Sequence, residues 1–276
     1  MHYYRTFKVK RFIIALTTLA VLTVLFTTVA IGQTDTTKVD TNKCKMQTFA
    51  NAGLVSQYLW RGAMLDAKPN IQPIVGLTYG GFEVGAMGSV SFLNNYSETD
   101  IYASYKYKCF KLSVTDFYID MSNGATDNLA RTYFDYSANY IYTKDSLGNV
   151  VGTGIQTAGH HILCDLVFLG TEKIPIKFTM STMLHSGWDL YSNGNRKYTT
   201  YFEARYLFKT WEIYAGAISG QSDFYINKIN KFNIINIGTA YNYNIKINEN
   251  YSIPAVAQLC INPQMEKIYF TFGVTF

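Results

Sequence analysis

A serine nucleophile needs a base beside it, and Ser192 has a histidine nearby in sequence. Ser192 stands in the stretch Tyr191-Ser192-Asn193-Gly194, and His185 lies seven residues before it. The position two residues before the serine, where a base could lie next to it, is Leu190. Ser-Asn-Gly is also a common turn. We therefore interpret Ser192 as a turn residue and predict no catalytic residue.

Metal binding needs several converging donor side chains, and the sequence supplies few of them. His160 and His161 are adjacent, but they could bind a metal only with further ligands that the pattern does not show. The four cysteines contain neither a CxxC pair nor a metal-site spacing: Cys44, Cys109, Cys164 and Cys260. We predict no metal site and no cofactor, and we interpret the cysteines as small apolar side chains. A disulfide between Cys44 and Cys109 stays open as an alternative.

Charged side chains make up 16% of the chain, whereas about 25% is usual in soluble proteins. The formal net charge of +5 arises near the start of the chain, from Arg5, Lys8, Lys10 and Arg11. The rest holds 20 basic and 19 acidic side chains, which gives no reason to expect nucleic acid as a partner. Six charged residues are predicted to line an aqueous lumen: Glu83, Lys106, Lys177, Glu203, Arg205 and Glu212.

The segments that carry these residues alternate with a period of two. In the stretch 82–92, Phe82, Val84 and Val90 share one face and Glu83 lies on the other, as in a strand with one apolar face. Segments of about 9–12 residues, the length of a tilted membrane strand, follow one another with turns between them. They are 49–60, 69–79, 82–92, 99–107, 110–120, 157–168, 175–184, 198–208, 211–219, 233–244, 252–261 and 267–276.

The segment 267–276 places Ile268, Phe270, Phe272, Val274 and Phe276 on one face. Such an apolar edge promotes aggregation, whereas a closed barrel pairs the last strand with the first. A strand of a soluble sandwich is the alternative. The pattern is similar to the assembly signal of bacterial outer-membrane barrels, which implies that Phe270, Phe272 and Phe276 are recognised by the barrel-assembly machinery. We predict an all-β fold, a transmembrane antiparallel up-and-down β-barrel of about 12 strands of the outer-membrane type.

The start of the chain has the pattern of an exported protein. Basic residues precede an uncharged run from Phe12 to Ile31 and the small-x-small sequence Ala30-Ile31-Gly32. Residues 1–32 are thus predicted to be a cleaved signal peptide, with a membrane-spanning helix as the alternative. Residues 33–47 would be a polar periplasmic lead-in, and 48–276 the barrel.

Alternate connections between the predicted strands are short, which is typical of periplasmic turns, and the others are longer. This pattern places both barrel termini in the periplasm. It also requires 121–156 to be one long outer excursion, so a further candidate strand at 132–143 is placed in a hairpin above the membrane.

The most specific motifs lie between residues 53 and 90. They are Ser56-x-Tyr58-x-Trp60-Arg61-Gly62, then Lys68-Pro69-x-x-Gln72, and then Gly81-Phe82-x-x-Gly85-x-x-Gly88-Ser89. This series resembles the TorF-type porin family, also known as a conserved family of unknown function (Gcw_chp). Pro73 after Gln72 departs from the family pattern, as does Glu83-Val84 where the family tends to have Tyr-Ala. The resemblance implies an outer-membrane barrel with channel activity.

Arg61 and Lys68 flank the first long connection of the predicted barrel. We expect them to face each other across the outer mouth, where they could bind an anion or a lipopolysaccharide phosphate. In the alternative, Arg61 only fixes the hairpin tip to carbonyls at strand ends.

The predicted function is passive diffusion of small solutes across the outer membrane of a Gram-negative bacterium, with weak ion selectivity and no enzymatic activity. A non-conducting barrel that binds a surface partner or stabilises the membrane is the second hypothesis. An enzyme that modifies outer-membrane lipid is the third. The expected partners are outer-membrane lipid, lipopolysaccharide and the barrel-assembly machinery, and the sequence does not fix an oligomeric state.

Overall fold

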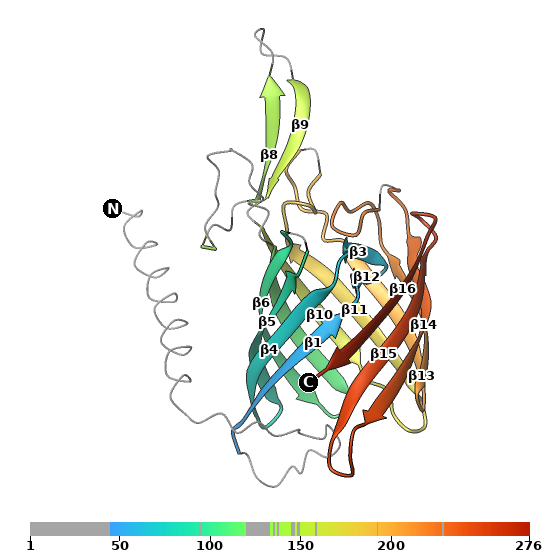
Figure 1. Cartoon of the computed structure of the whole chain (residues 1–276). Coiled ribbons are helices and arrows are strands. Elements are labelled where there is room, and N and C mark those ends of the chain that lie inside the picture. The colour runs from blue at the N-terminus through green and yellow to red at the C-terminus, as the bar shows by residue number, and fades with distance from the viewer. Residues whose placement is uncertain are drawn as a thin grey trace, which may run out of the picture. The chain divides into compact units, whose positions relative to one another are not determined.

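The structure is a computed structural model, and it describes residues 45–276 except 94, 120–132, 135, 137, 145–146, 148–149, 158, 192 and 228. Within these residues, twelve strands form a closed antiparallel barrel in which chain neighbours are paired (Figure 1). The barrel strands are β1 (Gln47–Val55), β4 (Asn70–Tyr79), β5 (Phe82–Ser91), β6 (Ser97–Tyr107), β7 (Phe110–Ile119), β10 (His160–Phe168), β11 (Ile176–His185), β12 (Thr200–Phe208), β13 (Trp211–Ile218), β14 (Asn233–Lys246), β15 (Ser252–Asn262) and β16 (Lys267–Thr275). The predicted closed, antiparallel, up-and-down barrel and its number of strands are confirmed.

The barrel closes where the last strand meets the first. β16 pairs with β1 through Gly53 opposite Thr275 and Val55 opposite Gly273. The backbone N–H of Ala52 donates to the carbonyl of Phe276 at 3.1 Å, and the N–H of Phe276 donates back at 3.0 Å. The expected pairing of the terminal strand is therefore present, and it leaves this edge hydrogen-bonded.

The outer face of the wall is apolar. On β16, Ile268, Phe270 and Phe272 are 65%, 61% and 61% exposed, and on β5 Phe82 is 60% exposed. Their sequence neighbours face the interior, because successive side chains of a strand point to opposite sides. A continuous exposed band of this kind is suited to contact with lipid tails rather than water. No helix in the described part of the chain is long and apolar enough to span a membrane.

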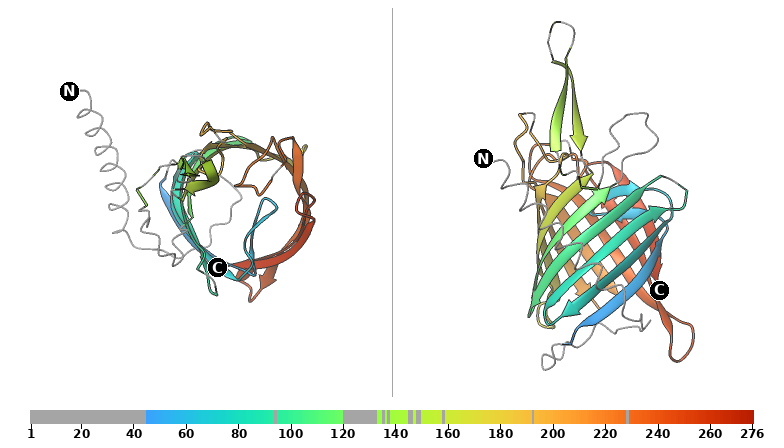
Figure 2. Two further views of the ribbon diagram at one scale, coloured as in Figure 1. Left: turned by 90° about the horizontal axis from the view of Figure 1, so that it is seen from above. Right: turned by 90° about the vertical axis from the view of Figure 1, so that its left-hand side faces the viewer.

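Two short hairpins lie outside the barrel sheet. The strands β8 (Ala138–Lys144) and β9 (Val150–Thr157) pair only with each other, so the candidate strand at 132–143 is not part of the wall. The strands β2 (Tyr58–Trp60) and β3 (Ala63–Asp66) form the other hairpin. Seen along the barrel, the β2–β3 hairpin lies inside the ring of strands (Figure 2).

The predicted strand 49–60 is wrong in its second half. β1 ends at Val55, a bend follows, and the chain then turns into the lumen as β2. Alternation continues through the bend, because Tyr58 and Trp60 keep the spacing of an aromatic wall. These two side chains pack inside the barrel instead, where they bury apolar area against other aromatic rings.

Candidate functional site in the barrel lumen

The tip of the β2–β3 hairpin is held against the tops of β14 and β15. Arg61 and Gly62 both have positive φ, 48° and 81°, which closes a tight turn. A Cβ on Gly62 would lie 2.1 Å from the carbonyl oxygen of Ile235, so only glycine allows this approach. The buried Asn262 side chain donates to the Gly62 carbonyl at 2.8 Å. The hairpin is therefore fixed by shape as well as by hydrogen bonds.

Arg61 connects the hairpin to the barrel wall. Its guanidinium donates to Ser181 Oγ at 2.6 Å, to the Tyr225 hydroxyl at 3.1 Å and to both carboxylate oxygens of Asp165 at 3.3 Å. The side chains of Arg61 and Asp165 are only 14% and 19% exposed. Burial alone would lower the pKa of Arg61, but Tyr225 and Asp165 raise it above its usual range. The guanidinium is thus charged at any pH that a barrel meets.

Aromatic rings fill one sector of the lumen around this arginine. Trp60 stacks on Tyr225 with ring centroids 5.5 Å apart, and Tyr225 stacks on Tyr201 at 5.7 Å. The guanidinium of Arg61 lies 4.4 Å from the Trp60 ring and 4.8 Å from the Tyr201 ring. We call the buried residues of this sector the lumen core: Leu163, Met183, Tyr201, Ile218, Phe224, Tyr225 and Ile235. The lumen core and the hairpin together narrow the barrel interior.

The base of the hairpin is held from a different wall. The Tyr58 hydroxyl donates to Glu98 of β6 at 3.1 Å, and Tyr96 donates to the same carboxylate. Asp66 accepts from the backbone N–H of Lys68 at 3.1 Å, and the Lys68 side chain is exposed. Arg61 and Lys68 therefore do not face each other across an outer mouth. The expected position of Arg61 is corrected, because its side chain lies in the lumen and bonds to Asp165, Ser181 and Tyr225 rather than to backbone carbonyls.

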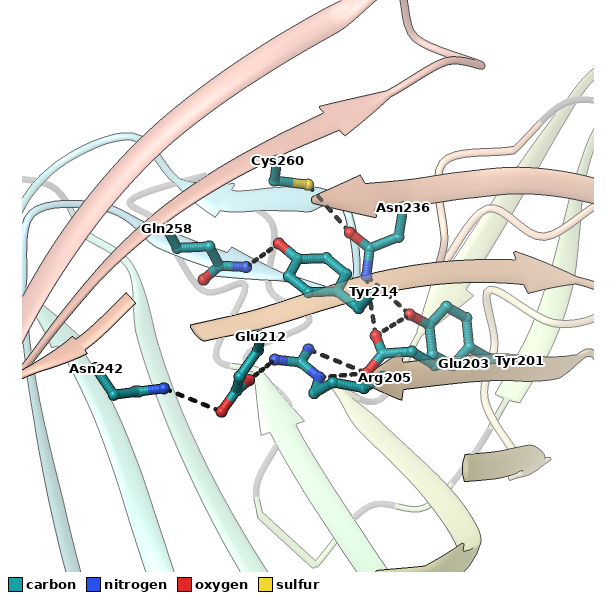
Figure 3. Close-up of polar contacts among 9 residues, drawn as sticks. All are labelled: Tyr201, Glu203, Arg205, Glu212, Tyr214, Asn236, Asn242, Gln258 and Cys260. Atoms are coloured by element: carbon teal, nitrogen blue, oxygen red, sulfur yellow. Dashed lines mark hydrogen bonds and ion pairs between the residues drawn. The ribbon is translucent and has the colours of Figure 1, made fainter. Parts of the chain in front are cut away.

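Three of the six predicted lumen residues form one network on β12 and β13 (Figure 3). Arg205 donates to Glu203 Oε1 at 3.0 Å and to Glu212 Oε2 at 2.6 Å. Glu203 also accepts from the Tyr201 hydroxyl at 2.6 Å and from Asn236 at 3.1 Å. Each charge in this network is therefore matched by neighbours, as burial beside apolar walls requires.

The other three residues do not complete a ring with this network. Lys177 of β11 lies directly opposite Arg205 in the strand register. Glu83 of β5 is 3.9 Å from Lys111 of β7, and Lys106 lies opposite Lys111 near the end of β6. Lys177 thus lies beside the network, whereas Glu83 and Lys106 lie on another part of the inner face. Asp165 and Lys111 were not among the predicted residues.

A cavity of about 300 Å³ lies below the hairpin, between it and the network of β12 and β13. Its lining combines charged, polar and aromatic side chains from the hairpin and from β10, β11, β12, β14 and β15. These residues are Leu59, Trp60, Arg61, Asp165, Val167, Lys177, Thr179, Tyr201, Glu203, Arg205, Asn236 and Gln258. In this cavity a small solute can contact both the hairpin and the wall.

Two histidine contacts lie on opposite faces of β10: His161 shares the inner face with Leu163, and His160 shares the outer face with Cys164 and Leu166. His160 Nδ1 is 2.9 Å from Asp116, and His161 Nδ1 is 2.7 Å from Ser186 Oγ. Both histidines and Ser186 are buried, and Trp188 stacks on His161 at 4.4 Å. Among the described residues, no group of three or more His, Cys, Asp or Glu side chains could hold a metal ion. Ser192 and Cys44 lie outside the described residues, and Cys109, Cys164 and Cys260 are free thiols.

No protein-family model and no curated protein matches this sequence. The lumen must therefore be interpreted from its own geometry.

Proposed function

We propose that the chain is an outer-membrane β-barrel through which small polar solutes diffuse, and that the β2–β3 hairpin sets the width of the path. The observation that carries the proposal is a polar, charged inner face beside a cavity, enclosed by a wall whose outer face is apolar. Charges at mid-depth on a lipid-facing wall cost about 2–4 kcal/mol each, so this division of side chains favours insertion in a bilayer. The aromatic residues exposed on β16 fit the same placement.

Weak ion selectivity follows from how the lumen charges are paired. Arg61 is paired with Asp165, and Arg205 is paired with both Glu203 and Glu212. A lumen with paired charges has no ring of one sign that would exclude cations or anions. We therefore expect a channel that conducts both ion signs.

Planar-bilayer recording of the purified chain tests this proposal. We expect small but resolvable conductance steps and a reversal potential close to zero in a potassium chloride gradient. A reversal potential near the limit for either ion would contradict weak selectivity. A correctly folded barrel that never conducts, even after the hairpin is shortened, would contradict channel activity.

A second candidate function is a non-conducting barrel that acts through its surface. The observation that favours it is the close packing of the hairpin on the lumen core, where Tyr225 and Ile235 have no exposed surface. Such a barrel would contact outer-membrane lipid, lipopolysaccharide or a surface partner. Silence in bilayers together with normal folding would make this the better explanation. A lipid-modifying activity stays a third hypothesis without a described catalytic group.

A further inference from the structure

The cavity below the hairpin contains three cationic side chains whose partners differ. Arg61 is bound by Asp165, and Arg205 by two carboxylates. Lys177 also lines the cavity, but no hydrogen bond or ion pair joins its ammonium to another residue in the described part of the chain. The ammonium of Lys177 is therefore a free donor group in the cavity wall.

The carboxylates nearest in the register are already occupied. Glu203 accepts from Arg205 on one oxygen, and from Tyr201 and Asn236 on the other. Glu212 accepts from Arg205 on one oxygen and from Asn242 at 3.0 Å on the other. All carboxylate oxygens of this pair thus have donors other than Lys177, and neither carboxylate forms a hydrogen bond or an ion pair with its ammonium among the described residues.

The strand register adds a second reason for an external anion. Lys177 and Arg205 are direct cross-strand partners on the inner face. Like charges in this arrangement destabilise a sheet. An anion beside Lys177 would reduce this repulsion without breaking the bonds that Arg205 makes. A ligand of negative charge beside Lys177 would thus add to the attraction that Glu203 and Glu212 already exert on its ammonium.

Size and ring contacts limit the kind of anion. A volume of about 300 Å³ is at the lower end for small-molecule pockets, which favours a solute of few atoms. The ring of Trp60 is covered by Arg61 and Tyr225, so it does not offer a free face for stacking an aromatic ligand. The remaining lining includes Thr179 and Gln258, whose side chains can hydrogen-bond to hydroxyl groups.

We propose that this cavity binds a short, hydroxylated aliphatic monocarboxylate, with its carboxylate on the ammonium of Lys177. The inference rests on the proposed channel function, because it names the solute class that the lumen favours. It leaves overall ion selectivity weak, since the other two cations of this cavity, Arg61 and Arg205, are held by carboxylates.

Lactate is a suitable probe, and propane-1,2-diol is its neutral counterpart of similar size. Saturation-transfer NMR on the purified full chain in detergent measures binding of each. We expect saturable binding of lactate and none of the diol. Lys177→Met should weaken lactate binding roughly tenfold or more, the loss expected for one charge-assisted hydrogen bond. Lys177→Arg keeps the charge and should keep binding.

Lys173→Met is the matched control, because Lys173 is an exposed lysine in the turn just before β11. It should bind lactate as the wild type does. Equal lactate binding by Lys177→Met, or equal binding of the diol and lactate by the wild type, would overturn the inference. Absence of lactate binding by the folded wild type would do the same.

The two proposals fail in different ways. Lactate binding through Lys177 by a barrel that is silent in bilayers would reject the channel function and leave the anion site intact. A conducting barrel whose lactate affinity does not depend on Lys177 would reject the anion site alone.

Discussion

Arg61→Met should release the β2–β3 hairpin from the lumen. The guanidinium bonds to Asp165, Ser181 and Tyr225, and it is the link from the hairpin tip to β10 and β11. Methionine keeps much of the packing on Trp60 but removes the charge and every donor. The change also leaves the Asp165 carboxylate without its partner inside the barrel.

The size of the effect follows from the burial of this ion pair. Removing one partner of a fully buried pair costs about 3–5 kcal/mol. Water reaches the Arg61 and Asp165 side chains to a limited extent, at 14% and 19% exposure, so we take the lower end of this range. A loss of about 3 kcal/mol changes the ratio of docked to released hairpin by roughly a hundredfold.

Chymotrypsin cleavage measures this ratio without relying on channel activity. The preferred cleavage sites, Tyr58 and Trp60, lie on the hairpin, and Tyr58 is only 7% exposed. When reclosing is faster than cleavage, the cleavage rate follows the population of the open form. We expect cleavage in Arg61→Met to be roughly a hundredfold faster than in the wild type, which follows from the same 3 kcal/mol.

Two controls separate release of the hairpin from general unfolding. Lys68→Met changes an exposed lysine at the base of the same hairpin and should leave the rate unchanged. Arg61→Met combined with Asp165→Asn removes the unpaired charge and should be cleaved more slowly than Arg61→Met alone. Equal cleavage of Arg61→Met and the wild type would refute the role of Arg61 in holding the hairpin.

Two further predictions concern the hairpin turn and the barrel seam. Gly62→Ala should lower the heat-denaturation temperature more than Gly194→Ala. Both glycines have positive φ, but only the Cβ added at Gly62 would collide with a carbonyl oxygen, that of Ile235. Equal shifts would show that the close approach does not matter. Deleting Phe276 should reduce membrane insertion in cells while refolding into detergent stays nearly intact, because its exposed side chain contributes little beyond the pairing with Ala52. Equal loss in both settings would contradict a role in assembly.

The barrel could be predicted from sequence because the pattern that defines each strand lies within a few neighbouring residues. Each strand alternates apolar and polar side chains, and a membrane requires the same face to be apolar in every strand. The predicted segments 82–92 and 211–219 therefore match β5 and β13 within a residue. β14 extends to Lys246, beyond the predicted end at residue 244, since Ile245 and Lys246 still pair with β15.

The inward hairpin could not be predicted, because its residues keep the alternation of a wall strand. Tyr58 and Trp60 have the spacing expected of an outward aromatic face, and only the contacts of Arg61 with distant strands show the inward turn. Those contacts join residues separated by more than a hundred positions. A pattern read along one strand contains no information about such pairs.

The lumen network could be predicted in part. Glu203 and Arg205 could be predicted because they lie on one face of a strand whose other face is apolar. Asp165 was not predicted because both faces of β10 carry apolar side chains. Cys164 and Leu166 face outward and Leu163 is buried in the lumen core, so polar and apolar residues do not alternate along this strand. A single acidic residue within an apolar strand was the available signal.

The most direct test of the hairpin as the element that narrows the channel is single-channel conductance with and without it. In the shortened chain, a flexible Gly-Ser linker replaces residues 57–67, so that β1 still connects to β4. We predict a larger single-channel conductance for the shortened barrel than for the wild type under the same salt and voltage. Equal conductance in two barrels that both fold would contradict the claim that the hairpin sets the width of the path.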